Sequence, residues 1–166
     1  MLTKNFYKLL LSNMFARGET IEITKPNGTV TTTTNSNYLL SGLSYVSCCE
    51  FATGVYGTFF GTGRTPPTMD DYKLESPITD GTLHSQSVTP LRGFEQDHAR
   101  LYATHEVHNS GSNDVTITEV GVFGLGASIS DNAFLLDRTV LDTPITIPAG
   151  GSKSITVAIQ FNYPSA

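Results

Sequence analysis

The chain has 166 residues and a mass of 17.9 kDa, which is the size of a single domain. Only 15% of its residues are charged, against about 25% in a typical domain. Hydrophobic residues make up 39%, and the chain holds 23 Thr and 15 Ser. This composition excludes a disordered chain or a helical bundle and favours an all-β fold.

The charge pattern bears on the partners of the chain. The formal charge is −5, and five Lys and five Arg are scattered along the sequence, so no basic face of the kind that binds nucleic acid is expected. No apolar run approaches the roughly 18 residues of a membrane span, and we expect neither a membrane anchor nor a signal peptide. Cys48 and Cys49 are neighbours, a spacing that disfavours a disulfide and predicts a reducing compartment or indifference to redox.

The first patterned segment is an amphipathic helix over residues 2–15, capped by Thr3 and ended by Gly18. One apolar stripe holds Leu2, Phe6, Leu9, Leu10 and Met14. Tyr7, Leu11 and Phe15 widen the apolar surface beyond what a helix lying on one domain needs. We therefore predict that residues 1–17 form a docking helix with that stripe facing a partner. The alternative is that the helix simply closes one end of its own domain.

From residue 20 the pattern alternates, as in strands. Residues 20–24 and 29–34 predict a hairpin whose turn, Pro26–Asn27–Gly28, uses glycine for a positive φ. Residues 37–47 cannot be assigned to helix or strand by periodicity. Residues 55–63 predict a strand whose glycines indicate a bulge or close backbone approach.

The longest non-periodic segment, residues 64–80, predicts a loop fixed by proline and aspartate. Its exposed rim is expected at Pro66, Pro67, Asp70, Asp71 and Tyr72. Tyr72 and Leu74 should pin the loop to the core.

Further strands are predicted up to the end of the chain. Residues 83–91 and 94–108 should pair around Arg92–Gly93, and residues 115–123, 133–141, 144–148 (a short edge strand) and 154–161 should follow. Ile155, Val157, Ile159 and Phe161 share one face of the last strand. Residues 18–166 are therefore predicted to form a single antiparallel β-sandwich, jelly-roll or immunoglobulin-like in type.

A search for catalytic chemistry yields weak candidates. His105 and His108 are three apart in a predicted strand and so point to opposite faces, unlike zinc ligands on a helix. His84 and His98 could meet across a sheet or a symmetry axis. Asp70, Asp71 and Glu75 lack the spacing of a calcium loop and fit turn capping better.

The remaining candidates are no stronger. Asp131, Asp137 and Asp142 form no inferable acid–base pair. A cysteine nucleophile at Cys48 or Cys49 has no local supporting motif, and the glycines of residues 54–63 do not form a nucleotide cradle. We therefore predict no catalytic residue, no metal and no cofactor.

Several blocks of the sequence resemble small structural proteins of tailed-bacteriophage virions. The resemblance runs through most of the chain in order, in residues 1–7, 61–78, 109–111, 117–123, 135–141 and 148–152. It implies a non-enzymatic virion protein whose partners are other virion proteins, capsid or tail/neck subunits. The particle would be assembled in the cytoplasm of a bacterial host.

The low-charge, hydroxyl-rich composition is that of a subunit packed against many neighbours, and it favours a homo-oligomer. We expect a multi-copy protein that decorates or stabilises the particle, with capsid decoration preferred over a tail or neck accessory. The alternative is a host-surface or carbohydrate-binding module of a fibre or tail, which would use exposed tyrosines such as Tyr38, Tyr45, Tyr56, Tyr72 and Tyr102.

Overall fold

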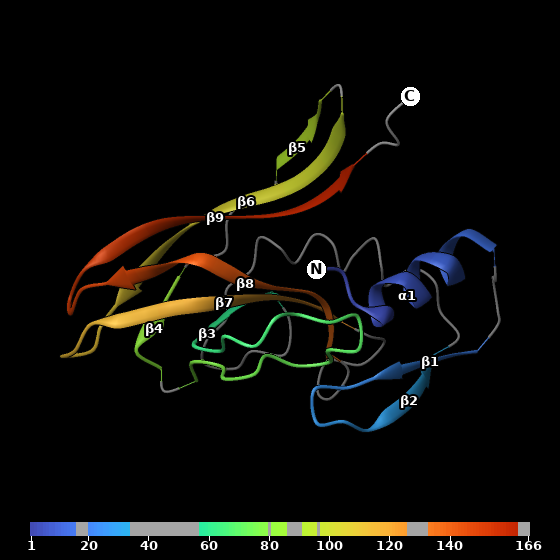
Figure 1. Cartoon of the computed structure of the whole chain (residues 1–166), viewed down its shortest axis with the longest axis horizontal. Helices are drawn as coiled ribbons and strands as arrows, with labels where there is room; N and C mark the ends of the chain where they lie inside the picture. The colour runs from blue at the N-terminus through green and yellow to red at the C-terminus, as the bar shows by residue number, and fades with distance from the viewer. Residues whose placement is uncertain are drawn as a thin grey trace.

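The computed structural model describes residues 1–15, 20–33, 57–79, 81–85, 91–95, 97–125 and 133–162. The chain is mostly antiparallel β-sheet with one short N-terminal helix (Figure 1). The elements, in chain order, are α1 (Lys4–Phe15), β1 (Ile21–Thr24), β2 (Val30–Thr33), β3 (Gly57–Gly61), β4 (Leu83–His84), β5 (Leu91–Phe94), β6 (His98–Asn109), β7 (Val115–Leu125), β8 (Ala133–Ile147) and β9 (Ser152–Asn162).

Two larger sheets and one hairpin make up the β structure. In the first sheet β7 lies between β3 and β8, and in the second β6 has β4 and β5 on one side and β9 on the other. All of these pairs are antiparallel. Strands β1 and β2 form the predicted hairpin, with Gly28 at a φ of 84° in its turn.

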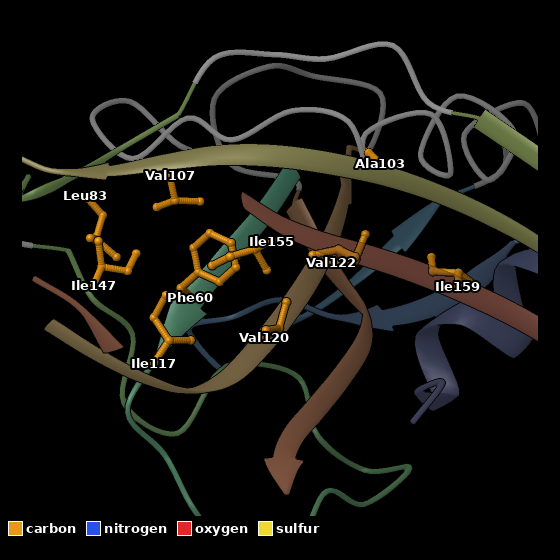
Figure 2. Packing of buried hydrophobic residues seen from close by; sticks show 11 residues of the cluster. Phe60, Leu83, Ala103, Val107, Ile117, Val120, Val122, Ile147, Ile155 and Ile159 are labelled. Carbon is orange, nitrogen blue, oxygen red and sulfur yellow. The ribbon is translucent and has the colours of Figure 1, made fainter. Parts of the chain in front are cut away.

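The main hydrophobic core lies between the two larger sheets (Figure 2). β7 supplies Ile117, Val120 and Val122, which pack with residues of β6 and β9. The predicted inward face of the last strand is confirmed for Ile155, Val157 and Ile159, whereas Phe161 is half-buried. Alternation of apolar and polar residues therefore placed this face correctly.

Helix α1 begins as predicted, since the amide of Phe6 donates to the hydroxyl of Thr3. The helix packs on β1 and β8. Phe6 and Leu9 are buried there in a second core cluster with Ile23, Phe134 and Leu136. The helix thus covers a part of its own domain.

Two predicted strand boundaries are wrong. Arg92 and Gly93 lie inside β5 rather than in a turn, and the amide of Glu95 donates to the carbonyl of His98 to close the β5–β6 turn. Residues 133–147 form one strand, not two. The pairing of β8 with β7 is nonetheless interrupted where Pro144 lies, between Val140 and Ile145, because proline cannot donate to a ladder. Residues 37–47 lie outside the described residues.

Candidate functional site

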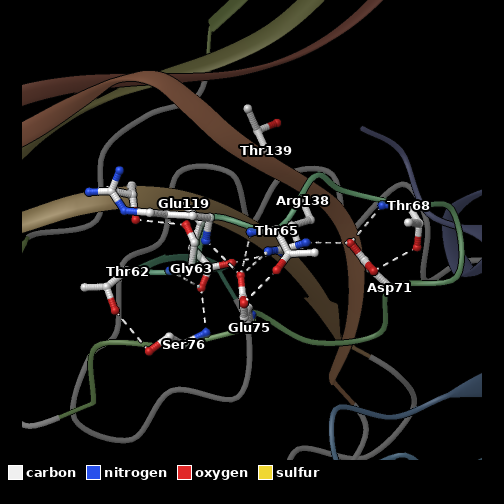
Figure 3. A network of polar contacts seen from close by, with 12 residues as sticks. Thr62, Gly63, Thr65, Thr68, Asp71, Glu75, Ser76, Glu119, Arg138 and Thr139 are labelled. Atoms are coloured by element: carbon white, nitrogen blue, oxygen red, sulfur yellow. Dashed lines mark hydrogen bonds and ion pairs between the residues drawn. The ribbon is translucent and has the colours of Figure 1, made fainter.

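A buried ion network joins the predicted loop to the first sheet. The guanidinium of Arg138 on β8 contacts three carboxylates: Nε is 2.9 Å from Glu119, Nη1 is 2.9 Å from Asp71 and Nη2 is 3.4 Å from Glu75 (Figure 3). Arg138 is 3% exposed and Glu119 is fully buried on β7. A buried charge is tolerated only when it is paired and hydrogen-bonded, and both conditions are met here.

Glu119 also organises the backbone of the loop. Its carboxylate accepts hydrogen bonds from the amides of Gly63 (3.1 Å), Glu75 (3.1 Å) and Ser76 (2.7 Å). At Gly63 a Cβ atom would lie 2.6 Å from this carboxylate. The close backbone approach predicted for the glycines of this segment is therefore confirmed, and what approaches is Glu119.

The two loop carboxylates have lowered pKa values. Burial would raise the pKa of Asp71, but hydrogen bonds from Thr68 and Arg138 outweigh it. The pKa of Glu75 is lowered by hydrogen bonds from the amide and hydroxyl of Thr65 and the amide of Arg64. Both groups are thus held in the charged form, which orders the loop from both ends.

The helix and the loop, predicted separately, meet in one surface. The amide of Lys4 donates to the carbonyl of Met69 (2.8 Å), and the Lys4 ammonium pairs with Asp70. A cavity of about 260 Å³ lies at this junction, lined by Lys4, Asn5, Lys8, Thr24, Met69, Asp70, Asp71 and Tyr72. We call the exposed residues around it the helix–loop surface: Lys4, Tyr7, Lys8 and Leu11 of α1, with Met69 and Asp70 of the loop.

Two of the predicted docking residues need correction. Phe6 and Leu9 are buried in the chain's own core and are not available to a partner. Leu2 and Leu10 are half-buried, and the side chain of Met14 lies outside the described residues. The exposed apolar groups are on the neighbouring face of the helix, where Tyr7 is 42% and Leu11 is 56% exposed.

The predicted rim of the loop divides in a similar way. Pro66 and Asp70 are exposed, and Pro67 is half-buried. Asp71 is turned inward to Arg138, so it is a structural anchor rather than a free rim residue. Tyr72 is half-buried, with its ring beside Gly28 of the β1–β2 turn. Leu74 is buried, as predicted.

The histidines and acidic residues can now be placed. His105 is buried and His108 exposed on β6, so they point to opposite faces as predicted. His84 pairs with His108 across β4 and β6 and does not meet His98. Asp70, Asp71 and Glu75 are paired with protein cations, and Asp71 also caps a turn by accepting from the amide of Thr68.

Other candidates fall partly outside the described residues, as do Cys48, Cys49 and Asp131. Asp137 accepts a hydrogen bond from Thr139, and Asp142 is exposed on β8. Tyr38, Tyr45 and Tyr56 also lie in segments that are not described. Among the residues that are, no three His, Cys, Asp or Glu side chains gather in a way that could hold a metal ion.

The network residues Glu119 and Arg138 were missed by the sequence reasoning. Each is a lone charge in an apolar strand, Ile117–Thr118–Glu119–Val120 and Leu136–Asp137–Arg138–Thr139. That position is itself a signal, because charged side chains in buried strands require partners. The partner could not be named, since the register of the two strands depends on irregularities between Ile117 and Glu119 and between Val122 and Phe123.

Comparison of the chain with protein-family models, with curated proteins and with solved structures finds no match. Within the described ranges, no helix has the length and apolar character to span a bilayer.

Proposed function

We propose that the chain is a non-enzymatic structural protein of a tailed-phage virion, present in many copies. It decorates or stabilises the particle, and capsid decoration is preferred over a tail or neck accessory. The two facing sheets support a β-sandwich domain, whose jelly-roll or immunoglobulin-like type is part of the proposal. The resemblance of residues 61–78 to virion proteins adds to this, because these residues include the loop that Arg138 and Glu119 anchor.

The observation that carries the proposal is the helix–loop surface. Tyr7 and Leu11 are exposed apolar side chains on a helix whose opposite face is fixed in the core. Lys4 and Lys8 flank them, and the adjoining loop is held by buried ion pairs. A rigid surface loses little conformational entropy on docking, and aromatic and apolar groups at its centre contribute most of the affinity.

The test is incorporation into particles. The full-length variant Tyr7→Glu/Leu11→Glu should fold with an unchanged melting temperature, because both side chains are exposed. Its amount in purified particles should fall about tenfold or more, the effect of losing two apolar groups from an interface. Val30→Glu is the matched control, since Val30 is exposed on β2 away from the helix, and it should incorporate like the wild type.

Two results would contradict the proposal. One is incorporation of the Tyr7→Glu/Leu11→Glu variant at the wild-type level, which would remove the role of this surface. The other is absence of the wild-type chain from purified particles, which would remove the virion assignment itself.

A second function, binding of a host-surface carbohydrate, is favoured by a specific feature of the loop. Tyr72 borders both the cavity at Lys4 and a second cavity of about 260 Å³ lined by Thr65, Thr68, Asp70, Asp71, Tyr72, Lys73, Glu75 and Arg138. An aromatic ring among hydroxyl and carboxylate groups suits a sugar. Saturable binding to one glycan class on an array, lost in Tyr72→Ala, would favour this function.

A further inference from the structure

The free edges of the two larger sheets differ in how they are protected. An unpaired edge strand presents a row of backbone donors and acceptors to any second chain, and proteins usually cover, shorten or interrupt such edges. Each edge in the described part of the chain can be assessed from its pairing.

Three of these edges carry clear protection. On the outer side of β3, Gly61 forms a bridge with Pro77, and the amide of Ile78 donates to the carbonyl of Phe60. On the outer side of β8, Leu2 forms a bridge with Asp137, and Pro144 interrupts the strand further along. In the second sheet, β4 and β5 have only two and four residues.

Strand β9 is different. It runs for 11 residues, and all of them from Ser152 to Asn162 pair in one register with β6, without a bulge. It contains no proline, and its one charged side chain is Lys153, near one end. Among the described residues, none pairs with the opposite edge of β9, which is drawn as the long red strand in Figure 1.

We propose that the open edge of β9 pairs with the same edge of a second copy of this chain, antiparallel and about a twofold axis at Val157. This inference concerns the chain itself and does not depend on the proposed place in a virion. It joins the second sheets of two copies into one continuous sheet.

The sequence of β9 suits this pairing. With Val157 on the axis, all 11 residues find partners: Ile155 lies opposite Ile159 of the other copy, and Thr156 lies opposite Ala158. The core-facing residues stay on one side of the sheet and the small polar residues on the other, as a sheet with one buried face requires. Residue faces would be mismatched by a one-residue slip.

The charges are also compatible with self-pairing. Lys153 lies opposite Phe161 of the second copy and far along the strand from the second Lys153. No like charges face each other directly, an arrangement that would destabilise an antiparallel pair. A second copy therefore fits the edge without repulsion, which argues for this occupant over a differently charged strand.

A charge-swap experiment tests both the interface and its register. In Thr156→Glu/Ala158→Glu, two carboxylates face each other twice across the axis, and the dimer dissociation constant should rise about tenfold or more. In Thr156→Lys/Ala158→Glu, opposite charges face each other, and the dimer should persist. Both variants lose the same Thr104–Thr156 hydrogen bond, so they are matched for folding, which circular dichroism checks. Sedimentation velocity over a concentration series measures the oligomeric state of the full chain.

A cysteine variant gives an independent readout. Val157→Cys puts two thiols on the axis, where directly opposed residues are about 5 Å apart, so mild oxidation should yield a covalent dimer. Ser152→Cys is the control, because its two copies would be roughly 33 Å apart along the strands. The wild-type chain reports any dimer formed through Cys48 or Cys49.

The inference is overturned if the wild-type chain is monomeric at the highest concentration reached. It is equally overturned if the two charge variants associate alike, or if Ser152→Cys crosslinks as well as Val157→Cys. A dimer that responds as described but is absent from phage particles would support this inference and contradict the proposed function.

Discussion

At the scale of single residues, Arg138 is the side chain on which the loop depends most. Its guanidinium lies between a strand carboxylate, Glu119, and two loop carboxylates, Asp71 and Glu75. Burial would lower the pKa of Arg138, but its bonds to Asp71 and Glu119 raise it. The arginine therefore stays charged, and each carboxylate it contacts is held in place.

Arg138→Met should destabilise the chain by about 3–5 kcal/mol, because it leaves the fully buried Glu119 without its cationic partner. Urea unfolding followed by circular dichroism measures the loss. Arg100→Met is the control: Arg100 is exposed and only 3.7 Å from the exposed Glu95, a pair worth about 1 kcal/mol or less. Equal losses in the two variants would contradict a special role for Arg138.

Removing Glu119 as well should not restore stability. An apolar replacement of both partners is often neutral for a simple buried pair, but Glu119 also accepts from the amides of Gly63, Glu75 and Ser76. These donors would remain buried or would need water. Glu119→Leu/Arg138→Met should therefore stay less stable than the wild type in the same urea experiment, and a variant at least as stable as the wild type would show that the backbone bonds contribute little.

The pH dependence follows from the lowered pKa values of Asp71 and Glu75. A carboxyl group with a lowered folded-state pKa stabilises the fold above its unfolded pKa of about 4, and that contribution disappears as the pH falls through the folded-state pKa. Asp71→Asn removes part of it. The variant should melt below the wild type at neutral pH, and the gap should close below about pH 4.

Thermal melts from neutral to acid pH check this expectation. Asp142→Asn, a change at an exposed aspartate of β8 outside the network, should leave the wild-type profile unaltered. A gap between wild type and Asp71→Asn that is constant with pH would show that the lost stability comes from packing rather than from the carboxylate charge.

At the scale of the elements, the loop of residues 61–79 is held against β7 through glycine positions. A Cβ atom on Gly63 would lie 2.6 Å from the Glu119 carboxylate and 2.7 Å from Cβ of Glu75. Neither neighbour can move freely, because both belong to the network. The loop and the buried carboxylate thus require each other.

Gly63→Ala should accordingly cost about 1–3 kcal/mol, the range for overpacking a well-packed site. Gly93→Ala in β5 is the matched control, since its Cβ would meet only the flexible side chain of Arg100, at 3.1 Å, and the change should stay within about 0.5 kcal/mol. Urea unfolding compares the two. A neutral Gly63→Ala would mean that the loop can shift without breaking the Glu119 contacts.

Local patterns predicted most elements but not the contacts between them. Alternation and turn residues located the β1–β2 hairpin and the inward face of β9, because these features depend on neighbouring residues alone. The ends of β5 and the continuity of β8 depend on partner strands and were predicted wrongly. The Arg138 network needs the exact register of β7 and β8, which irregularities determine, so its members could be singled out as lone charges but not paired.

At the scale of the whole molecule, α1 is part of the domain rather than an appendage. Phe6 and Leu9 complete a core cluster with β1 and β8. The segment before the helix also covers the outer edge of β8, where the amide of Thr3 donates to the carbonyl of Leu136 and Leu2 forms a bridge with Asp137. The boundary placed at residue 17 on sequence grounds therefore crosses a shared core.

Deleting residues 1–15 should consequently destabilise the chain rather than only detach it from a partner. Burial of a Phe or Leu side chain contributes about 1.5–3 kcal/mol, so loss of Phe6 and Leu9 alone should lower the unfolding free energy by about 3–6 kcal/mol. This is a large share of the 5–15 kcal/mol typical of a domain. Uncovering the β8 edge should also promote aggregation.

Thermal melts and light scattering of the truncated and full-length chains measure both effects. Full-length Tyr7→Glu/Leu11→Glu is the proper comparison, because it alters the exposed face of the same helix and leaves Phe6 and Leu9 in place. If the truncated chain melted like the full-length one and stayed monodisperse, the second core cluster would not contribute to stability and α1 would be a separable docking element after all. A truncated chain that melts lower and aggregates would show that docking must be studied with surface variants, since deletion changes the fold and the surface together.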